Sequence, residues 1–249
     1  MARKSNSKKA LAGVSIEQTI DTLDQYSSNM RDIKPITPAQ VEAYKQWNKG
    51  SNLILSGAPG SGKTFIALYL ALQDLVKNRK KRLVIVRSVV PTRDIGFLPG
   101  TQEEKEAAYL TPYVGVVSEI FNNNPTLFTS FIKNGTIEFL TTSFIRGITL
   151  RDAVVVVDEF QNCNFHELDS IITRIGKRSR IIFSGDYYQT DFTNKKEKEG
   201  IAQFLRIIER LKTFKSVEFT WKDCVRSGLV KDYLMMKEKM TENKEIILP

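Results

Sequence analysis

The segment that most constrains this chain is a glycine-rich octapeptide, GAPGSGKT, at residues 57–64. It matches the pattern G-x-x-x-x-G-K-[ST] in full, and it lies between an apolar segment at residues 53–55 and a stretch of helical periodicity over residues 63–77. Glycines let the backbone curl until its N–H groups face phosphate groups, and the positive end of the following helix adds to the attraction. A strand, such a loop and a helix in this order predict an α/β domain with a nucleotide site.

The motif also predicts the role of each side chain in the loop. Lys63 is expected to bridge the β- and γ-phosphates, and the Thr64 hydroxyl is expected to bind Mg²⁺. A glycine turn that caps an ordinary helix is the alternative. The expected nucleotide-binding residues are Gly57, Ala58, Pro59, Gly60, Ser61, Gly62, Lys63, Thr64 and Phe65.

Two further motifs follow apolar segments. Asp158 and Glu159 come directly after four valines, and we expect Asp158 to hold the metal through water and Glu159 to polarise the attacking water. The alternative is an ordinary turn, where aspartate is common. The segment SGDYYQ at residues 184–189 follows another apolar stretch. A polar group here, with Gln189 as the candidate, is expected to reach the γ-phosphate or its water; a plain turn is again the alternative.

Short apolar segments alternate with longer amphipathic ones along the rest of the chain. Strands are expected at residues 53–55, 83–86, 137–140, 154–157, 181–183 and 217–219. Helices are expected between them, and this alternation predicts a mainly parallel sheet with helices on both faces. The expected organisation is a disordered basic tail at residues 1–12, a helical extension at 13–36 and one domain at 37–249.

Composition narrows the classes of function. The chain has 37 Lys and Arg against 28 Asp and Glu, a net charge of +9 that makes a polyanionic partner worth considering. One histidine and two cysteines exclude multi-histidine and cysteine-based metal sites. No apolar run approaches the roughly 20 residues of a membrane span, and the N-terminus has no hydrophobic signal core. We therefore expect a cytoplasmic protein without membrane contact.

Several motifs together resemble one known family. DEFQ at 158–161 and GDYYQ at 185–189 resemble motifs II and III of the first helicase superfamily, and TPAQ at 37–40 resembles its adenine-recognising glutamine motif. Further blocks are RDIGFLPG at 93–100, EK at 104–105, IRGITL at 145–150, TRIG at 173–176 and DCVR at 223–226. In this order, over about residues 36–240, they resemble the PhoH family, in a compact form similar to its phage-encoded members.

The resemblance implies a RecA-like P-loop ATPase that binds ATP and Mg²⁺, with Gln40 at the adenine. It also implies a ring-shaped homo-oligomer, expected to be a hexamer, that binds or remodels single-stranded nucleic acid, with RNA favoured, or acts as a helicase. The chain has room for one ATPase lobe, so we expect a neighbouring subunit to supply an arginine. The candidates are Arg226, Arg174 and Arg146.

Residues 89–100 are expected to line a central pore or to form an ordinary oligomer contact. The candidate nucleic-acid residues are Arg87, Arg93 and Arg146. The aromatic side chains at positions 109, 113, 121 and 128 are expected in the core or an interface rather than in base stacking. The main alternative function is a nucleotide-gated assembly or binding protein with slow ATP turnover, and a small-molecule kinase is a weaker one.

Overall fold

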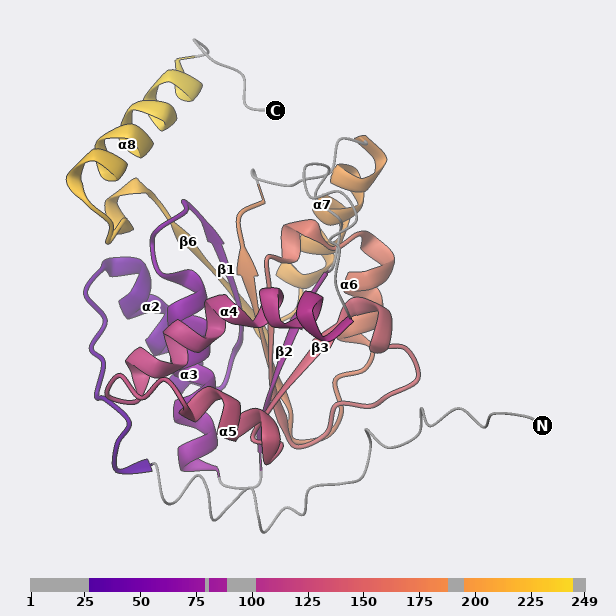
Figure 1. The fold of residues 1–249 in the computed structure, drawn as a ribbon. Helices are drawn as coiled ribbons and strands as arrows, with labels where there is room; N and C mark the ends of the chain where they lie inside the picture. The colour runs from indigo at the N-terminus through magenta and orange to yellow at the C-terminus, as the bar shows by residue number, and fades with distance from the viewer. Residues whose placement is uncertain (1–26, 79–80, 89–101, 188–194, 244–249) are drawn as a thin grey trace.

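Each of the six predicted apolar segments forms a strand, and the strands make one sheet in the described part of the chain (Figure 1). The computed structural model describes residues 27–78, 81–88, 102–187 and 195–243. All adjacent strands are parallel, in the order β3-β2-β4-β5-β1-β6. Their bounds are β1 Asn52–Gly57, β2 Arg82–Arg87, β3 Ile137–Thr141, β4 Ala153–Asp158, β5 Arg180–Gly185 and β6 Phe214–Phe219.

Helices cover both faces of this sheet. One face packs against α2 (Pro38–Asn48), α3 (Lys63–Lys77), α4 (Gln102–Ile120) and α5 (Leu127–Lys133), and the other against α6 (Phe165–Ile172) and α7 (Lys195–Glu209). Short 3₁₀ helices follow three strands: η1 (Thr142–Phe144), η2 (Phe160–Asn162) and η3 (Trp221–Asp223). The last helix, α8 (Gly228–Glu242), extends away from these layers (Figure 1).

The central strand β4 shows why the sequence forms this layered structure. Its residues are buried throughout, because both faces of the sheet are covered. Side chains alternate along a strand, so Val154 and Val156 pack in the core with α3 while Val155 and Val157 pack in the core with α6. A run of four valines therefore supplies two hydrophobic cores at once.

The strand order confirms the expected RecA-like P-loop fold. Strand β5 lies between β1, which enters the glycine-rich loop, and β4, which ends in the acid pair. All these strands are parallel, so their carboxyl ends lie at one edge of the sheet, where ligands of open α/β sheets bind. Among the described residues, no helix is long and apolar enough to cross a membrane.

The tail at residues 1–12, Arg93, Gln189 and most of the predicted extension at 13–36 lie outside the described residues. Residues 31–36 form neither helix nor strand, and Ile33 packs against the core formed with α2 and α3. We call residues 28–36 the strap. Three of the four aromatic residues expected in the core, Tyr113, Phe121 and Phe128, are buried there.

Candidate nucleotide site

The glycine-rich loop connects the end of β1 to the start of α3, where its backbone N–H groups are available to an anion. Gly57 has φ +113°, and a Cβ at this position would lie 2.0 Å from the carbonyl oxygen of Phe219. That carbonyl accepts a hydrogen bond of 2.7 Å from Ala58 N. Only glycine fits here, because the loop turns sharply while it stays bonded to β6.

Lys63 reaches back over the loop that precedes it. Its Nζ donates to the carbonyl oxygens of Gly57 and Ala58, each at 2.7 Å. The residue is 9% exposed, and burial lowers the pKa of its ammonium group, while the charges of Asp186, Glu159 and Asp158 act in the opposite direction. An ammonium group held by carbonyls in this way is placed to move to a phosphate.

Asp158, at the end of β4, faces the first turn of α3. Its Oδ1 accepts a hydrogen bond of 2.8 Å from Thr64 Oγ1, and its Oδ2 accepts one of 3.0 Å from the hydroxyl of Tyr113 in α4. Burial chiefly raises the pKa of Asp158, and the charge of Glu159 adds to this; the bonds from Thr64 and Tyr113 and the charge of Arg87 oppose it.

This donor set fits a magnesium ion that is bound together with a nucleotide. Mg²⁺ takes oxygen ligands, and in nucleotide sites it is held by one or two protein groups plus substrate phosphates rather than by a full protein cage. A hydroxyl and a carboxylate 2.8 Å apart meet that description. The described residues contain no cluster of three or more His, Cys, Asp or Glu suited to a metal ion.

Glu159 adopts a left-handed backbone conformation, with φ 52° and ψ 44°, which a glutamate rarely does. This conformation follows β4 directly, and the side chain lines the pocket. Gln161, which is 3% exposed, donates from Nε2 to Glu159 Oε2 at 2.5 Å. The Oε1 atom of the same amide accepts from the backbone N–H of Asp186 at 3.0 Å.

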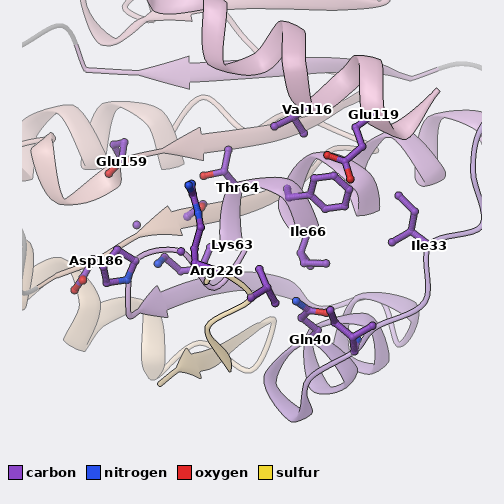
Figure 2. A pocket seen from close by; sticks show the side chains of 18 of the residues that line it. Ile33, Gln40, Lys63, Thr64, Ile66, Val116, Glu119, Glu159, Asp186 and Arg226 are labelled. Carbon is purple, nitrogen blue, oxygen red and sulfur yellow. The ribbon is translucent and has the colours of Figure 1, made fainter. Parts of the chain in front are cut away.

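These groups line a pocket of about 640 Å³ with two unlike ends (Figure 2). Lys63, Glu159, Asp186 and Arg226 gather at one end, which we call the phosphate end. The other end, which we call the base end, is formed by Gln40 of α2, by the strap and by apolar side chains. Figure 2 shows Ile33, Gln40, Ile66, Val116 and Glu119 at this end, and Ile36 and Phe65 also line the pocket.

Arg226 lies over the glycine-rich loop of its own chain. Val225 N donates to the carbonyl of Gly60 at 3.1 Å, and a Cβ on Gly60 would come within 2.7 Å of Arg226 Cγ. The expectation that Arg226 acts on a neighbouring subunit stays a prediction. Its place in the pocket makes the guanidinium available to a nucleotide bound by the same chain.

The other candidate arginines lie elsewhere. Arg87 ends β2 beside Asp158, and its positive charge acts on both Asp158 and Tyr113. Arg146 is exposed in the segment after η1. Arg174 lies at the opposite edge of the sheet from the pocket, where its carbonyl accepts from Leu150 N at 2.8 Å ahead of β4. The roles predicted for these three arginines, in nucleic-acid binding or in the site of a neighbouring subunit, stay predictions.

The sequence motifs leave two residues of the site unassigned. Gln161 belongs to the DEFQ segment, so its motif marks the position without giving it a role. Tyr113 lies 45 residues before Asp158, in a helix whose sequence shows only an aromatic residue suited to a core. No local signal predicts that its hydroxyl meets the carboxylate.

Comparison of the sequence with known proteins finds a matching protein family. A family model described as PhoH-like protein matches residues 32–238. A PhoH-like protein of Mycobacterium tuberculosis is 30% identical over 212 residues, which cover 85% of this chain and 59% of the relative. Protein PhoH of Escherichia coli K12 is 30% identical over 203 residues, covering 80% and 57%. The chain thus spans less than two thirds of the length of these curated relatives.

Comparison with solved structures finds more distant likenesses. The large terminase of a thermophilic bacteriophage has a TM-score of 0.47 at 13% identity, covering 80% of this chain and 50% of that one. Unliganded Pif1 from Bacteroides has a TM-score of 0.40 at 13% identity, covering 86% and 47%.

Proposed function

The chain belongs to the PhoH-like protein family, and on that premise we propose that it is a Mg²⁺-dependent ATPase that acts on nucleic acid. The observation that carries the proposal is the hydrogen bond of 2.8 Å between Thr64 Oγ1 and Asp158 Oδ1. It places the hydroxyl that begins α3 beside the carboxylate that ends β4, as a Mg²⁺–nucleotide site requires. Lys63 and Glu159 line the same pocket.

Each of these side chains has a distinct task in hydrolysis. Lys63 exchanges its two loop carbonyls for oxygens of the β- and γ-phosphates, and Glu159 orients and polarises the attacking water. Thr64 and Asp158 would hold Mg²⁺, which neutralises the charge that develops on the phosphates. Arg226 adds a permanent positive charge from the same chain beside the loop.

The hydrogen bonds of Gln40 support adenine as the base. Its Oε1 already accepts from Ile36 N at 2.9 Å, and its Nε2 donates to Ser61 O at 3.4 Å. One acceptor site and one N–H remain on the amide. Adenine offers a donor at N6 beside an acceptor at N7, whereas guanine offers two acceptors. The amide therefore complements adenine better than guanine.

We further propose that the protein works in the cytoplasm as a homo-oligomeric ring, with a hexamer expected, on single-stranded nucleic acid, with RNA favoured. The net charge of +9 supports a polyanionic partner. Phe144 is 61% exposed close to the exposed Arg146, and an aromatic ring with a nearby cation suits a stacked base and its phosphate. A head-to-tail ring brings two different faces of the subunit together, so Arg174, at the sheet edge opposite the pocket, is a candidate to reach a neighbour's site.

The test is ATP hydrolysis with and without single-stranded RNA or DNA. We expect nucleic acid to stimulate the wild type several-fold, and Asp158→Asn to lower turnover by about 10²-fold or more while nucleotide binding is largely kept. Asp169→Asn, an exposed aspartate in α6, is the matched control and should leave turnover unchanged.

Hydrolysis no faster than that of Lys63→Ala, or no response to any nucleic acid, would overturn the proposal. ATP-dependent assembly with slow turnover and no response to nucleic acid would support the alternative of a nucleotide-gated assembly protein.

A further inference from the structure

The side chain of Gln161 joins two parts of the site that follow different strands. Its Nε2 donates to the Glu159 carboxylate at 2.5 Å, and its Oε1 accepts from the backbone N–H of Asp186 at 3.0 Å. Strands β4 and β5 are neighbours, with Asp158 opposite Ser184. A single amide thus spans from the segment after β4 to the segment after β5.

Hydrogen-bond chemistry determines which way this amide points. The backbone N–H of Asp186 is a donor only, so the carbonyl oxygen of the amide must face it. The NH₂ group then faces Glu159, where only an acceptor satisfies it, and a carboxylate is such an acceptor. Reversing the amide would set donor against donor on one side and oxygen against oxygen on the other.

Gly185 makes this close approach possible. A Cβ at position 185 would lie 2.1 Å from Gln161 Oε1 and 2.9 Å from a ring carbon of Phe160. Gly185 has no positive φ, so its absence of a side chain serves the contact rather than a turn. The glycine of the GDYYQ segment therefore leaves the space that the glutamine side chain of the DEFQ segment occupies.

The bridge also bears on the conformation of Glu159. A left-handed backbone at a non-glycine residue is unfavourable and persists only where the surroundings hold it. Gln161 is buried, with 3% of its surface exposed, and it holds the end of this side chain inside the pocket.

We propose that Gln161 is a positioning residue that holds Glu159 on the attacking water and ties that carboxylate to the Gly185–Asp186 segment. The proposal rests on the proposed ATPase activity, in which Glu159 polarises the water. In this scheme Gln161 acts through its hydrogen bonds to Glu159 and to Asp186 N. A shift of Glu159 during turnover would reach the segment after β5 through this amide.

A double-mutant cycle tests the proposal. We expect Gln161→Leu to lower kcat by about 10²-fold, the loss that a misplaced catalytic group causes, with KM for ATP and affinity for a fluorescent ATP analogue changed less than about threefold. Because Gln161 acts through Glu159, Gln161→Leu should cost nothing further in a Glu159→Gln background. The rate of single-turnover ATP hydrolysis, with the Lys63→Ala rate as the baseline, is measured for the wild type, the two single variants and the double variant.

Gln161→Glu is the second variant, in case the leucine disturbs folding. The new carboxylate can still accept from Asp186 N, but its negative charge repels the Glu159 carboxylate. We therefore expect kcat to fall again while the affinity for nucleotide is unchanged. Gln46→Leu is the matched control, because Gln46 Nε2 donates to Glu42 Oε1 at 2.5 Å on α2, outside the pocket. It should leave kcat unchanged.

Additive losses of kcat in the cycle would overturn the assignment. A loss of kcat and of nucleotide affinity together with a lowered melting temperature would show a structural role and would also overturn it. Full activity of both Gln161 variants would do the same and leave the proposed ATPase intact. A wild type no faster than Lys63→Ala would overturn the ATPase proposal itself, and this inference with it.

Discussion

The two ends of the pocket are built in different ways. Apart from Arg226, which follows η3, the phosphate end consists of short segments that directly follow β1, β4 and β5, and its loop presents backbone N–H groups to phosphate. The base end is assembled from α2, the strap, the start of α3 and the end of α4. One end thus depends on motifs and strand order, and the other on how separate segments pack.

The strap shows what that packing requires. Ile33 N donates to the Tyr69 hydroxyl at 3.1 Å, and Ile33 O accepts from the Tyr44 hydroxyl at 3.0 Å. The two tyrosine rings stack with centroids 5.7 Å apart, and Arg31 N donates to the carbonyl of Ile120 at 2.9 Å. A few hydrogen bonds hold the wall of the base end, so we expect changes there to have smaller effects than changes at the phosphate end.

Removal of the phosphate-end ammonium should have the largest effect. Lys63→Ala deletes the group that Gly57 and Ala58 hold ready for phosphate, so kcat for ATP should fall by about 10²–10³-fold. Steady-state hydrolysis measures the change. Lys77→Ala, at the exposed far end of the same helix, should retain full activity. Comparable losses in both variants would place the effect in helix stability rather than in phosphate binding.

Tyr113→Phe should weaken magnesium binding. The change removes one hydrogen bond from the buried carboxylate of Asp158, and loss of such a partner to a metal ligand typically lowers metal affinity by about 10-fold or more. A Mg²⁺ titration of ATP hydrolysis measures the midpoint. Tyr44→Phe is the same chemical change at a tyrosine that bonds to the strap, and it should leave that midpoint unchanged. An unchanged midpoint in Tyr113→Phe would show that Thr64 and Asp158 hold the metal without its help.

Gln40→Ala should reduce the preference for ATP over GTP. The amide is the group that distinguishes the two bases, and one hydrogen bond contributes about 1 kcal/mol, so the ratio of kcat/KM for ATP and GTP should fall about five-fold. Gln46→Ala on the same helix is the control. A ratio that stays constant in Gln40→Ala would assign base selection to other residues of the base end.

The smallest effect is expected from Tyr44→Phe. It removes the hydrogen bond to Ile33 O, so the free energy of unfolding should fall by about 1 kcal/mol and ATP affinity by about two- to threefold. Chemical denaturation and equilibrium binding of a fluorescent nucleotide measure the two quantities. A loss of kcat at saturating ATP would contradict the separation of the two ends, since the hydroxyl is not at the phosphate end.

Motifs in the sequence predict the parts of the phosphate end that follow β1, β4 and β5, because each of these segments is contiguous in the chain. Four valines followed by two acids predict a buried strand that ends in the acid pair, and the structure has that strand with Asp158 at its end. The six strands of a mainly parallel sheet follow from the same local patterns, and the RecA-like fold follows from the resemblance that the motifs carry. Local patterns suffice to predict this part of the site, because the carboxyl ends of parallel strands all lie at one edge of the sheet.

Which distant side chains meet at that edge depends on strand order and helix packing. The order of the strands places β5 beside β4, and this brings the backbone of Asp186 within reach of Gln161. The packing of α4 on α3 brings Tyr113 to Asp158, and the segment after β6 lays Arg226 over Gly60 of the same chain. Such contacts join residues far apart in the chain, and they depend on strand pairing and helix packing, which no local motif encodes.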